Sequence, residues 1–474
     1  MDYEKLFAEK MDGLIADEME RTNTPGTALA VVENGQIVLT RTYGAKNFEL
    51  NSPVNADTLF NVASITKSFI SAGILKLQEQ GKLNVTDKVS DYLPITIGFD
   101  DDPILIHHLM SHSSGIPNLA DSMWSRNREH LYGIQNPIPR IPFTSWDDGF
   151  RYLNGSQEYL SKPGRRFHYN NFAYGILSKL ITEVSGEDYK SYLHKEIFSQ
   201  LRMDRTGFFS EVSDDPNLAR GYMDKPGSST REFIHVPYAE HKLTRSLDEA
   251  AGGLFSTVKE LANYLKMQLS GGEFEGKHVL SQESISEMQK RQFKEKYPSA
   301  SFSAAYGQKV SGYGFGFAID EDFLGHKLVQ HSGSFIGASA WFAFLPEFGR
   351  GAIMLSNHHP SPRIFAQAIL WESLGADVST WPLLKLREHR SHLEGEYLTY
   401  KGMNKITITA AGGALYLKSG NDRMQLIPMS DEPTLDYYIP TEMGGKEPVQ
   451  FEESEGRIFL NIERNRWKKV CTTE

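Results

Sequence analysis

Residues 64–82 read SITKSFISAGILKLQEQGK, and this stretch decides the fold that we expect for the surrounding chain. Its apolar residues recur at helical spacing, and Gly81 is placed to end a helix. Ile65, Phe69 and Ile70 together cover more than one face of that helix. The first turn is therefore expected to be buried on most sides.

The same stretch contains a chemical pair. Ser64 and Lys67 form a Ser-x-x-Lys sequence, which places both side chains on one face of a helix, one turn apart. A serine hydroxyl is a weak nucleophile until a base removes its proton, and lysine can act as that base only if its pKa falls from about 10.4 towards neutrality. Burial and the positive end of the helix dipole favour this change, which corresponds to roughly 4 kcal/mol for a lowering of about 3. The helix terminus also directs backbone N–H groups at an acyl carbonyl, as part of an oxyanion hole.

A second Ser-x-x-Lys pair is present, Ser256 with Lys259, and about two such pairs are expected by chance in a chain of this length. Thr257 and Glu260 have the spacing of a capping box ahead of an amphipathic helix. This arrangement predicts that Lys259 lies in an exposed first turn, so we assign the chemistry to the first pair.

The sequence Tyr169-Asn170-Asn171 follows a Pro-Gly turn and precedes a helix, so a loop can present a phenol and an amide. Tyr169 would take part in proton relay, and Asn171 would orient the lysine and the substrate amide. Tyr152-Leu153-Asn154 has the same pattern but lies in an ordinary helical stretch, and it is ranked well below.

A third motif, His331-Ser332-Gly333-Ser334, falls on an expected strand beside the cleft. Small residues there allow a substrate backbone to approach. The N–H of Ser334 can complete the oxyanion hole.

The segments around these motifs predict an α+β fold in which an antiparallel sheet is flanked by helices. An Asn34-Gly35 hairpin is expected within residues 24–44, and helices with long polar loops fill about 84–269. Strands are expected at 313–319, 337–346 and 349–357, followed by a helix at 364–374. We expect one sheet built from both ends of residues 1–380, with the helical block inserted between them.

After residue 380 the organisation changes. Residues 381–392 lose clear periodicity and are expected to be a linker. Residues 393–474 contain eight short alternating runs separated by turn residues, which predicts a small antiparallel β-barrel.

Composition excludes several classes of function. The chain has 474 residues and a net charge of -10, which disfavours nucleic acids and anionic membranes as partners. A single cysteine, Cys471, allows no internal disulfide and no cysteine-based metal site. Residues 1–21 are charged throughout and are typical of an amphipathic helix rather than a secretory signal, so a cytoplasmic protein is expected.

In order, Ser-x-x-Lys, Tyr-x-Asn and His-x-Gly resemble the motifs of the serine β-lactamase and penicillin-binding-protein superfamily, in particular its class C β-lactamase-like and D-aminopeptidase-like branch. The segments LFNVASITKSF, IHHLMSHSSGIP, PGRRFHYNNFAYGILSKLITEVSG and AGGLFSTVKELANY support the resemblance over about residues 26–375. It implies a β-lactamase/transpeptidase-like fold and an acyl-enzyme mechanism without metal or organic cofactor. In that mechanism Ser64 is acylated, Lys67 and Tyr169 move protons, and Asn171 and His331 shape the site.

Penicillin-recognising members have Lys-Thr-Gly as the third motif, and here His331, mostly neutral at pH 7, replaces that lysine. His-x-Gly is similar to D-aminopeptidases and to carboxylesterases of the superfamily. The carboxy-terminal barrel resembles the lipocalin-like domains of D-aminopeptidase-like relatives. In such relatives the barrel restricts access to the site or holds subunits together, so a homo-oligomer is one option.

Three hypotheses follow. The first is a serine peptidase or amidase acting on small peptides that contain D-residues, with transpeptidation as a further outcome of the same acyl-enzyme. The second is a carboxylesterase on the same site, with a β-lactamase ranked lower. The third is a non-catalytic binding protein that kept the fold.

His108 and His112 have a spacing that could suit zinc, but no acidic residue lies between them, and a metal site is not expected.

Overall fold

The computed structural model describes most of the chain, in two compact units. One unit extends to Leu374 and the other begins at Gly375. The described residues are 1–98, 101–119, 145–155, 158–225, 232–236, 238, 247, 249–293, 311–411, 414–420, 422–430, 433–441, 444–462 and 464–470. Cys471 lies outside them.

The amino-terminal residues are helical, as predicted, and lead into the expected hairpin. Strands β1 (Gly26–Glu33) and β2 (Gln36–Asn47) pair antiparallel around Asn34-Gly35. Both turn residues have positive φ, 50° and 75°, which is the backbone twist that the Asn-Gly pair supplies at low steric cost. The helical segments before the hairpin are α1 (Tyr3–Leu6), the π-helical turn η1 (Phe7–Met11) and α2 (Asp12–Arg21).

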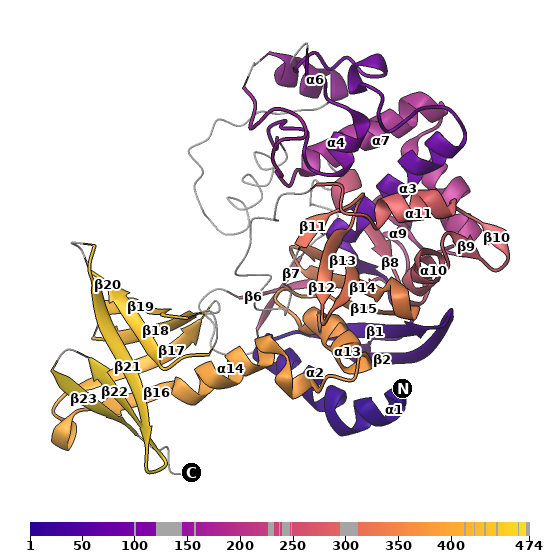
Figure 1. The fold of residues 1–474 in the computed structure, drawn as a ribbon. Coiled ribbons are helices and arrows are strands. Elements are labelled where there is room, and N and C mark those ends of the chain that lie inside the picture. The colour runs from indigo at the N-terminus through magenta and orange to yellow at the C-terminus, as the bar shows by residue number, and fades with distance from the viewer. Residues whose placement is uncertain are drawn as a thin grey trace. The chain divides into compact units, whose positions relative to one another are not determined.

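Eight strands form one antiparallel sheet that joins both ends of the first unit (Figure 1). Its order is β11-β12-β13-β14-β15-β1-β2-β3, and β1 pairs with β15 along its whole length. The expected sheet is therefore confirmed. The remaining strands are β3 (Ser52–Pro53), β11 (Ser311–Tyr313), β12 (Ala318–Phe323), β13 (His326–Phe335), β14 (Ala338–Leu345) and β15 (Arg350–Ser356).

One expected strand is wrong. Residues 313–319 turn between β11 and β12 instead of continuing as a single strand. Gly316 has φ +81°, and a Cβ on it would come within 2.6 Å of the Ser68 Cα atom. The alternating glycines thus provide a tight turn against the backbone at Ser68, which periodicity alone does not reveal.

The helical block lies between β3 and β11 and is built around α3 (Thr66–Glu79). This helix is preceded by a 3-10 turn, η2 (Ala63–Ile65), and is buried continuously from Thr66 to Leu75. It ends near Gly81, as predicted, because Gly81 has φ +68° and Lys82 N–H donates to the Leu77 carbonyl. Helix α7 (Asn171–Ser185) packs on both α3 and α4 (Ile106–Met110).

The shorter elements of the first unit complete this block and the edges of the sheet. These elements are β4 (Phe60–Asn61), η3 (Val89–Asp91), α6 (Trp146–Asn154), α8 (Tyr189–Leu193), η4 (His194–Phe198), η5 (Ser199–Leu201), β5 (Gly207–Phe208), α9 (Phe209–Val212), β6 (Gly221–Asp224), β7 (Phe233–Val236), η7 (Glu249–Ala251), β8 (Leu254–Ser256), α10 (Val258–Leu269), β9 (Glu273–Phe274), β10 (Lys277–His278), α11 (Gln282–Met288), η8 (Pro346–Phe348), η9 (Pro362–Ile364) and α13 (Phe365–Ser373). Among them, helices α10 and α13 pack on the main sheet.

The second unit contains a closed eight-stranded antiparallel barrel, as predicted (Figure 1). Its interior is filled by buried apolar side chains, among them Tyr397, Leu417 and Phe451, so this barrel is a packed core. Its elements are β16 (Gly395–Leu398), η11 (Tyr400–Gly402), β17 (Lys405–Ala411), β18 (Ala414–Ser419), β19 (Asp422–Pro428), β20 (Asp436–Pro440), β21 (Lys446–Ser454), β22 (Arg457–Ile462) and β23 (Asn465–Lys469).

The segment expected as a linker, 381–392, is helical. It follows η10 (Val378–Thr380) and forms α14 (Pro382–Leu393), with Pro382 at the first helical position. Leu393 is the only residue of this helix that is fully buried. Most of its other residues are half-buried, and its apolar side chains are not concentrated on one face, which explains why the periodicity did not predict it.

None of the described helices is long and apolar enough to cross a membrane.

Candidate active site

Ser64 and Lys67 lie together at the start of α3. Ser64 is in η2, which continues directly into the helix, and the Lys67 Nζ donates to the Ser64 Oγ at 3.1 Å. The Lys67 side chain is fully buried, whereas Ser64 is partly exposed. The amine is therefore within proton-transfer distance of a hydroxyl that a substrate can reach.

Three further groups position the Lys67 amine. Its Nζ donates to the Ala251 carbonyl at 2.6 Å. It also lies 4.9 Å from the ring centroid of Tyr169 and 5.6 Å from that of Tyr174. The carbonyl and the two rings fix the amine in the orientation that faces Ser64.

The turn before the nucleophile is held in an unusual conformation. Ala63 has φ +46°, in the left-handed region that alanine rarely adopts. Its N–H donates to the Asn61 Oδ1 at 3.0 Å, and its carbonyl accepts from the Thr66 hydroxyl at 2.6 Å. Val62 N–H donates to the Leu254 carbonyl at 2.9 Å. These bonds over-determine the strained residue and fix the position of the partly exposed Ser64.

The Tyr169 motif reaches the same place from the start of α7. Asn170 is the N-cap of this helix: its side chain accepts from Ala173 N–H at 3.0 Å and donates to the Ile116 carbonyl at 2.8 Å. Asn171 is half-buried, and its amide makes no hydrogen bond to any described residue. Asn170 is thus the structural residue of the pair, since it caps α7 and anchors the Ile116 carbonyl.

His331 lies on β13 with both ring nitrogens engaged inside the protein. Its Nδ1 donates to the Ser332 carbonyl at 2.7 Å, so its Nε2 accepts from the Tyr313 hydroxyl at 2.8 Å. Burial lowers the pKa of His331 to about 3, and the charge of Lys67 adds to this effect. The imidazole is neutral at physiological pH, and it orients Tyr313.

Acidification should destabilise the protein partly through His331. The pKa of His331 is about 3 in the folded chain and about 6.5 in an exposed imidazole. The contribution of His331 to the free energy of unfolding is therefore fully present above pH 6.5 and is lost as the pH falls towards 3. In that window each pH unit costs up to about 1.4 kcal/mol. Urea unfolding at pH 7, 6 and 5 should show this loss, and His331→Gln should flatten it. An unchanged slope in that variant would contradict the assignment.

Gly333 brings β13 against the nucleophile turn. A Cβ on it would lie 2.2 Å from the Val62 carbonyl oxygen and 3.1 Å from the Ala63 Cβ. These are mainly backbone atoms that cannot move aside, so glycine is required for the close approach. Ser334, the next residue, is exposed at this edge.

We expect Gly333→Ala to displace β13 from Ser64 and to reduce kcat/KM by at least about tenfold. Overpacking of this kind also costs about 1–3 kcal/mol of stability. Ester hydrolysis and urea unfolding measure the two effects. Gly13→Ala is the matched control, because a Cβ there meets nothing within 4 Å. If Gly333→Ala behaved like this control, the close approach would have no function.

The competing motifs lie outside this cluster. The Ser256 hydroxyl is buried and shares a hydrogen bond of 2.7 Å with the Thr206 hydroxyl. Thr257 caps α10 as predicted, and Lys259 is 49% exposed in an ion pair with Asp57. Asn154 of the Tyr152 motif accepts from Thr96 N–H at 2.8 Å and serves as a loop anchor.

Sequence reasoning missed four contributors to the site. The Ala251 carbonyl, Tyr174 and Tyr313 were not singled out, and His112 was considered only as a weak metal ligand. The His112 ring centroid lies 4.2 Å from that of Tyr169 and 4.7 Å from that of Tyr313. The segments that carried the resemblance contain three of these residues, Ala251, His112 and Tyr174, and this was the signal available.

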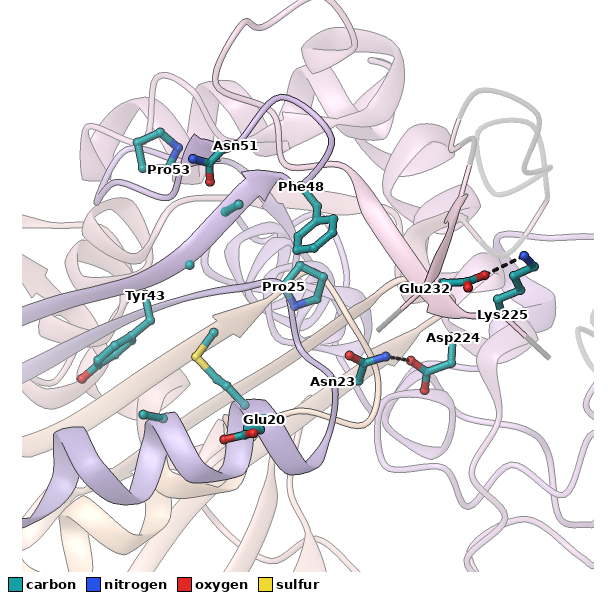
Figure 2. A pocket seen from close by; sticks show the side chains of 14 residues that line it. Glu20, Asn23, Pro25, Tyr43, Phe48, Asn51, Pro53, Asp224, Lys225 and Glu232 are labelled. Atoms are coloured by element: carbon teal, nitrogen blue, oxygen red, sulfur yellow. Dashed lines mark hydrogen bonds and ion pairs between the residues drawn. The ribbon is translucent and has the colours of Figure 1, made fainter. Parts of the chain in front are cut away.

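A separate hollow of the first unit is lined from α2, β2 and the β6–β7 hairpin (Figure 2). None of the site residues above lines it. Four of its polar residues form two pairs: Asn23 donates to Asp224 at 2.5 Å and Lys225 to Glu232 at 2.6 Å. These pairs contain no hydroxyl with a neighbouring amine, unlike the pair of Ser64 and Lys67.

Comparison with known proteins agrees with this geometry. The model of the Beta-lactamase family matches residues 11–375. The chain belongs to the beta-lactamase family. Members of this family are in general serine hydrolases. A second family model, the Pab87 octamerisation domain, matches residues 378–468. The carboxy-terminal barrel therefore matches an octamerisation domain, and its expected assignment as a lipocalin-like domain is corrected.

Several members of the beta-lactamase family are similar to this chain. Protein flp of Staphylococcus aureus (strain MRSA252) is 24% identical over 353 residues, 74% of this chain and 62% of the relative, so the chain spans less than two thirds of that protein. Penicillin-binding protein 4* of Bacillus subtilis (strain 168) is 26% identical over 431 residues, 87% of this chain and 88% of the relative.

Solved structures extend the likeness to both units. The octameric penicillin-binding protein homologue from Pyrococcus abyssi has a TM-score of 0.85 and 29% identity, and the match covers 99% of this chain and 100% of that chain. A penicillin binding protein from Bacillus halodurans, at 23% identity and a TM-score of 0.57, covers 76% of this chain and 98% of that one, and it shows the fold alone.

Proposed function

We propose that this protein is a serine hydrolase that forms an acyl-enzyme on Ser64. One observation carries the proposal: a fully buried Lys67 amine lies 3.1 Å from the Ser64 hydroxyl. Burial disfavours the charged form of an amine and so favours its action as a general base, while the Ala251 carbonyl and the rings of Tyr169 and Tyr174 hold it in place beside Ser64.

In the proposed reaction the Lys67 amine takes the Ser64 proton while the Oγ attacks the substrate carbonyl. The tetrahedral oxyanion is stabilised by the backbone N–H groups of Ser64 and Ser334. Collapse breaks the bond to the leaving group, which receives its proton through Tyr169. Water then attacks the acyl-enzyme, returns a proton to the relay and frees the hydroxyl; an amine in place of water gives transfer. The close approach of Gly333 to Val62 supports the role of the Ser334 N–H in the oxyanion hole, because it brings the neighbouring residue Ser334 towards Ser64.

The preferred substrates in this proposal are small peptides or amides that contain D-residues. Two observations support the choice. His331 stands where penicillin-recognising enzymes have a lysine, and its neutral ring offers no charge for a β-lactam carboxylate. The Asn171 amide makes no hydrogen bond to the described residues, so it can pair with a substrate amide.

A carboxylesterase is the second candidate, favoured by the same neutral His331, because esters carry no group that needs a cation there. Ester substrates also need less help for the leaving group. A panel of D-aminoacyl amides, D-peptides and p-nitrophenyl esters, assayed with wild type and Ser64→Ala, separates the two. Amine release that requires Ser64 supports the peptidase. Ester turnover without any amide turnover decides for the esterase, and no turnover with no covalent labelling of Ser64 leaves a binding protein.

We also propose that the protein assembles into an octamer through its carboxy-terminal unit. The match of residues 378–468 to an octamerisation-domain family and the likeness to an octameric homologue support this. Size-exclusion chromatography with multi-angle light scattering on the full chain should give a mass about eight times 53.5 kDa. A monomer at micromolar concentration would contradict the proposal.

A further inference from the structure

His112 is a buried residue of the site to which the proposed reaction gives no part. It follows α4 and is fully buried, with φ +58° in the left-handed region. A non-glycine residue stays in that region only where the surrounding structure over-determines it, and such residues gather at functional sites.

His112 accepts two backbone hydrogen bonds, one from each of the residues that flank Tyr169. The His112 carbonyl accepts from His168 N–H at 2.8 Å, and the His112 Nδ1 accepts from Asn170 N–H at 3.0 Å. The imidazole also packs on the Tyr169 ring, at 4.2 Å between centroids. The phenol between these two bonds can therefore move little relative to His112.

The hydrogen bonding also defines the state of the ring. Because Nδ1 accepts a backbone N–H, the proton of the neutral imidazole is on Nε2. This Nε2 is buried and has no hydrogen-bond partner among the described residues. Burial lowers the pKa of His112 well below its usual value, with the positive charge of Lys67 acting in the same direction. His112 is thus neutral and unsuited to supply or take protons near neutral pH.

We propose that His112 is a positioning residue that fixes Tyr169 for proton transfer through its Nδ1 bond to Asn170. The inference rests on the proposed function of Ser64, Lys67 and Tyr169. It assigns His112 no contact with the substrate. Its effect is exerted entirely through the tyrosine, which makes it separable from a general role in stability.

Isosteric substitutions test which ring nitrogen matters. An asparagine amide reaches the position of Nδ1 and a glutamine amide that of Nε2. We expect His112→Asn to keep kcat for a p-nitrophenyl ester within about threefold of wild type, and His112→Gln and His112→Ala to lose 10- to 100-fold in kcat with little change in KM. Retained kcat in the glutamine variant with loss in the asparagine variant would overturn the proposal.

A double-substitution cycle separates positioning from mere stability. In a Tyr169→Phe background, His112→Gln should cause no further loss of kcat, since its effect passes through the missing phenol. Independent losses that multiply would overturn the proposal. His108→Ala is the matched control, because the His108 Nδ1 also accepts a backbone N–H, from Leu105 at 3.1 Å. It should lower the melting temperature and leave kcat unchanged.

The two proposals fail in different ways. A wild-type protein without turnover and without labelling of Ser64 by a fluorophosphonate would refute the hydrolase itself. An active wild type whose folded His112→Ala and His112→Gln variants retain full kcat would refute only the role of His112. Melting curves of each variant show which proteins are folded.

Discussion

Ser64→Ala is expected to reduce turnover at least about 10⁴-fold while changing the melting temperature by less than about 2 °C. The nucleophile is lost outright, so no acyl-enzyme can form. The hydroxyl is partly exposed, and the protein bond lost with it is the one from the Lys67 amine, which keeps the Ala251 carbonyl as a partner. Steady-state hydrolysis and differential scanning calorimetry give the two readouts.

Ser256→Ala is the matched control for this substitution. Ser256 also begins a Ser-x-x-Lys sequence, but its buried hydroxyl is hydrogen-bonded to Thr206. Removing a buried hydrogen bond costs about 1 kcal/mol, so this variant should be less stable and fully active. A reversal of the two phenotypes would show that the wrong serine was chosen.

Lys67→Met is expected to have the second largest effect, a loss of about 10³-fold in kcat with KM nearly unchanged. Methionine fills much of the buried space and cannot accept the serine proton. Because Lys67 also donates to the Ala251 carbonyl, leaving that carbonyl unpaired should cost about 1–3 kcal/mol of stability. Hydrolysis and urea unfolding measure both.

Lys259→Met provides the control for the lysine. Its ammonium is half-exposed and paired with Asp57, and surface pairs contribute about 0–1 kcal/mol. Neither turnover nor stability should change measurably. Equal activity of the two lysine variants would remove Lys67 from the mechanism.

Local signals predicted much of the fold because they act over a few residues. The Asn34-Gly35 turn, the helix from Ser64 to Gly81 and the eight alternating runs of the barrel each encode their own geometry. The sequence also predicted one sheet built from both ends of residues 1–380, and the pairing of β1 with β15 confirms that sheet.

Features that depend on distant contacts could not be predicted. The turn at Gly316 exists because β11 and β12 pass close to Ser68, far away in sequence. The left-handed Ala63 is held by Asn61 and Thr66, and no propensity favours it. The half-buried helix α14 lacks the apolar stripe that marks helices in a sequence.

The candidate site shows the same division. The motifs of Ser64, Tyr169 and His331 could be chosen because each places reactive groups at a fixed spacing along the chain. The Ala251 carbonyl, Tyr313 and His112 act through tertiary contacts alone, at 2.6 Å to Lys67, 2.8 Å to His331 and 4.2 Å to the Tyr169 ring. The family segments pointed to the neighbourhood of Ala251 and His112, but the contacts themselves are visible only when the chain is folded.

The pH dependence of fluorophosphonate labelling at Ser64, followed by mass spectrometry from pH 5 to 10, tests the role of Lys67 most directly. If the buried amine activates the hydroxyl, the labelling rate should rise and then level off with an apparent pKa at least about two below the 10.4 of a free lysine. In Lys67→Met this plateau should disappear. A wild-type rate that rises in proportion to hydroxide up to pH 10, with no plateau, would contradict the account.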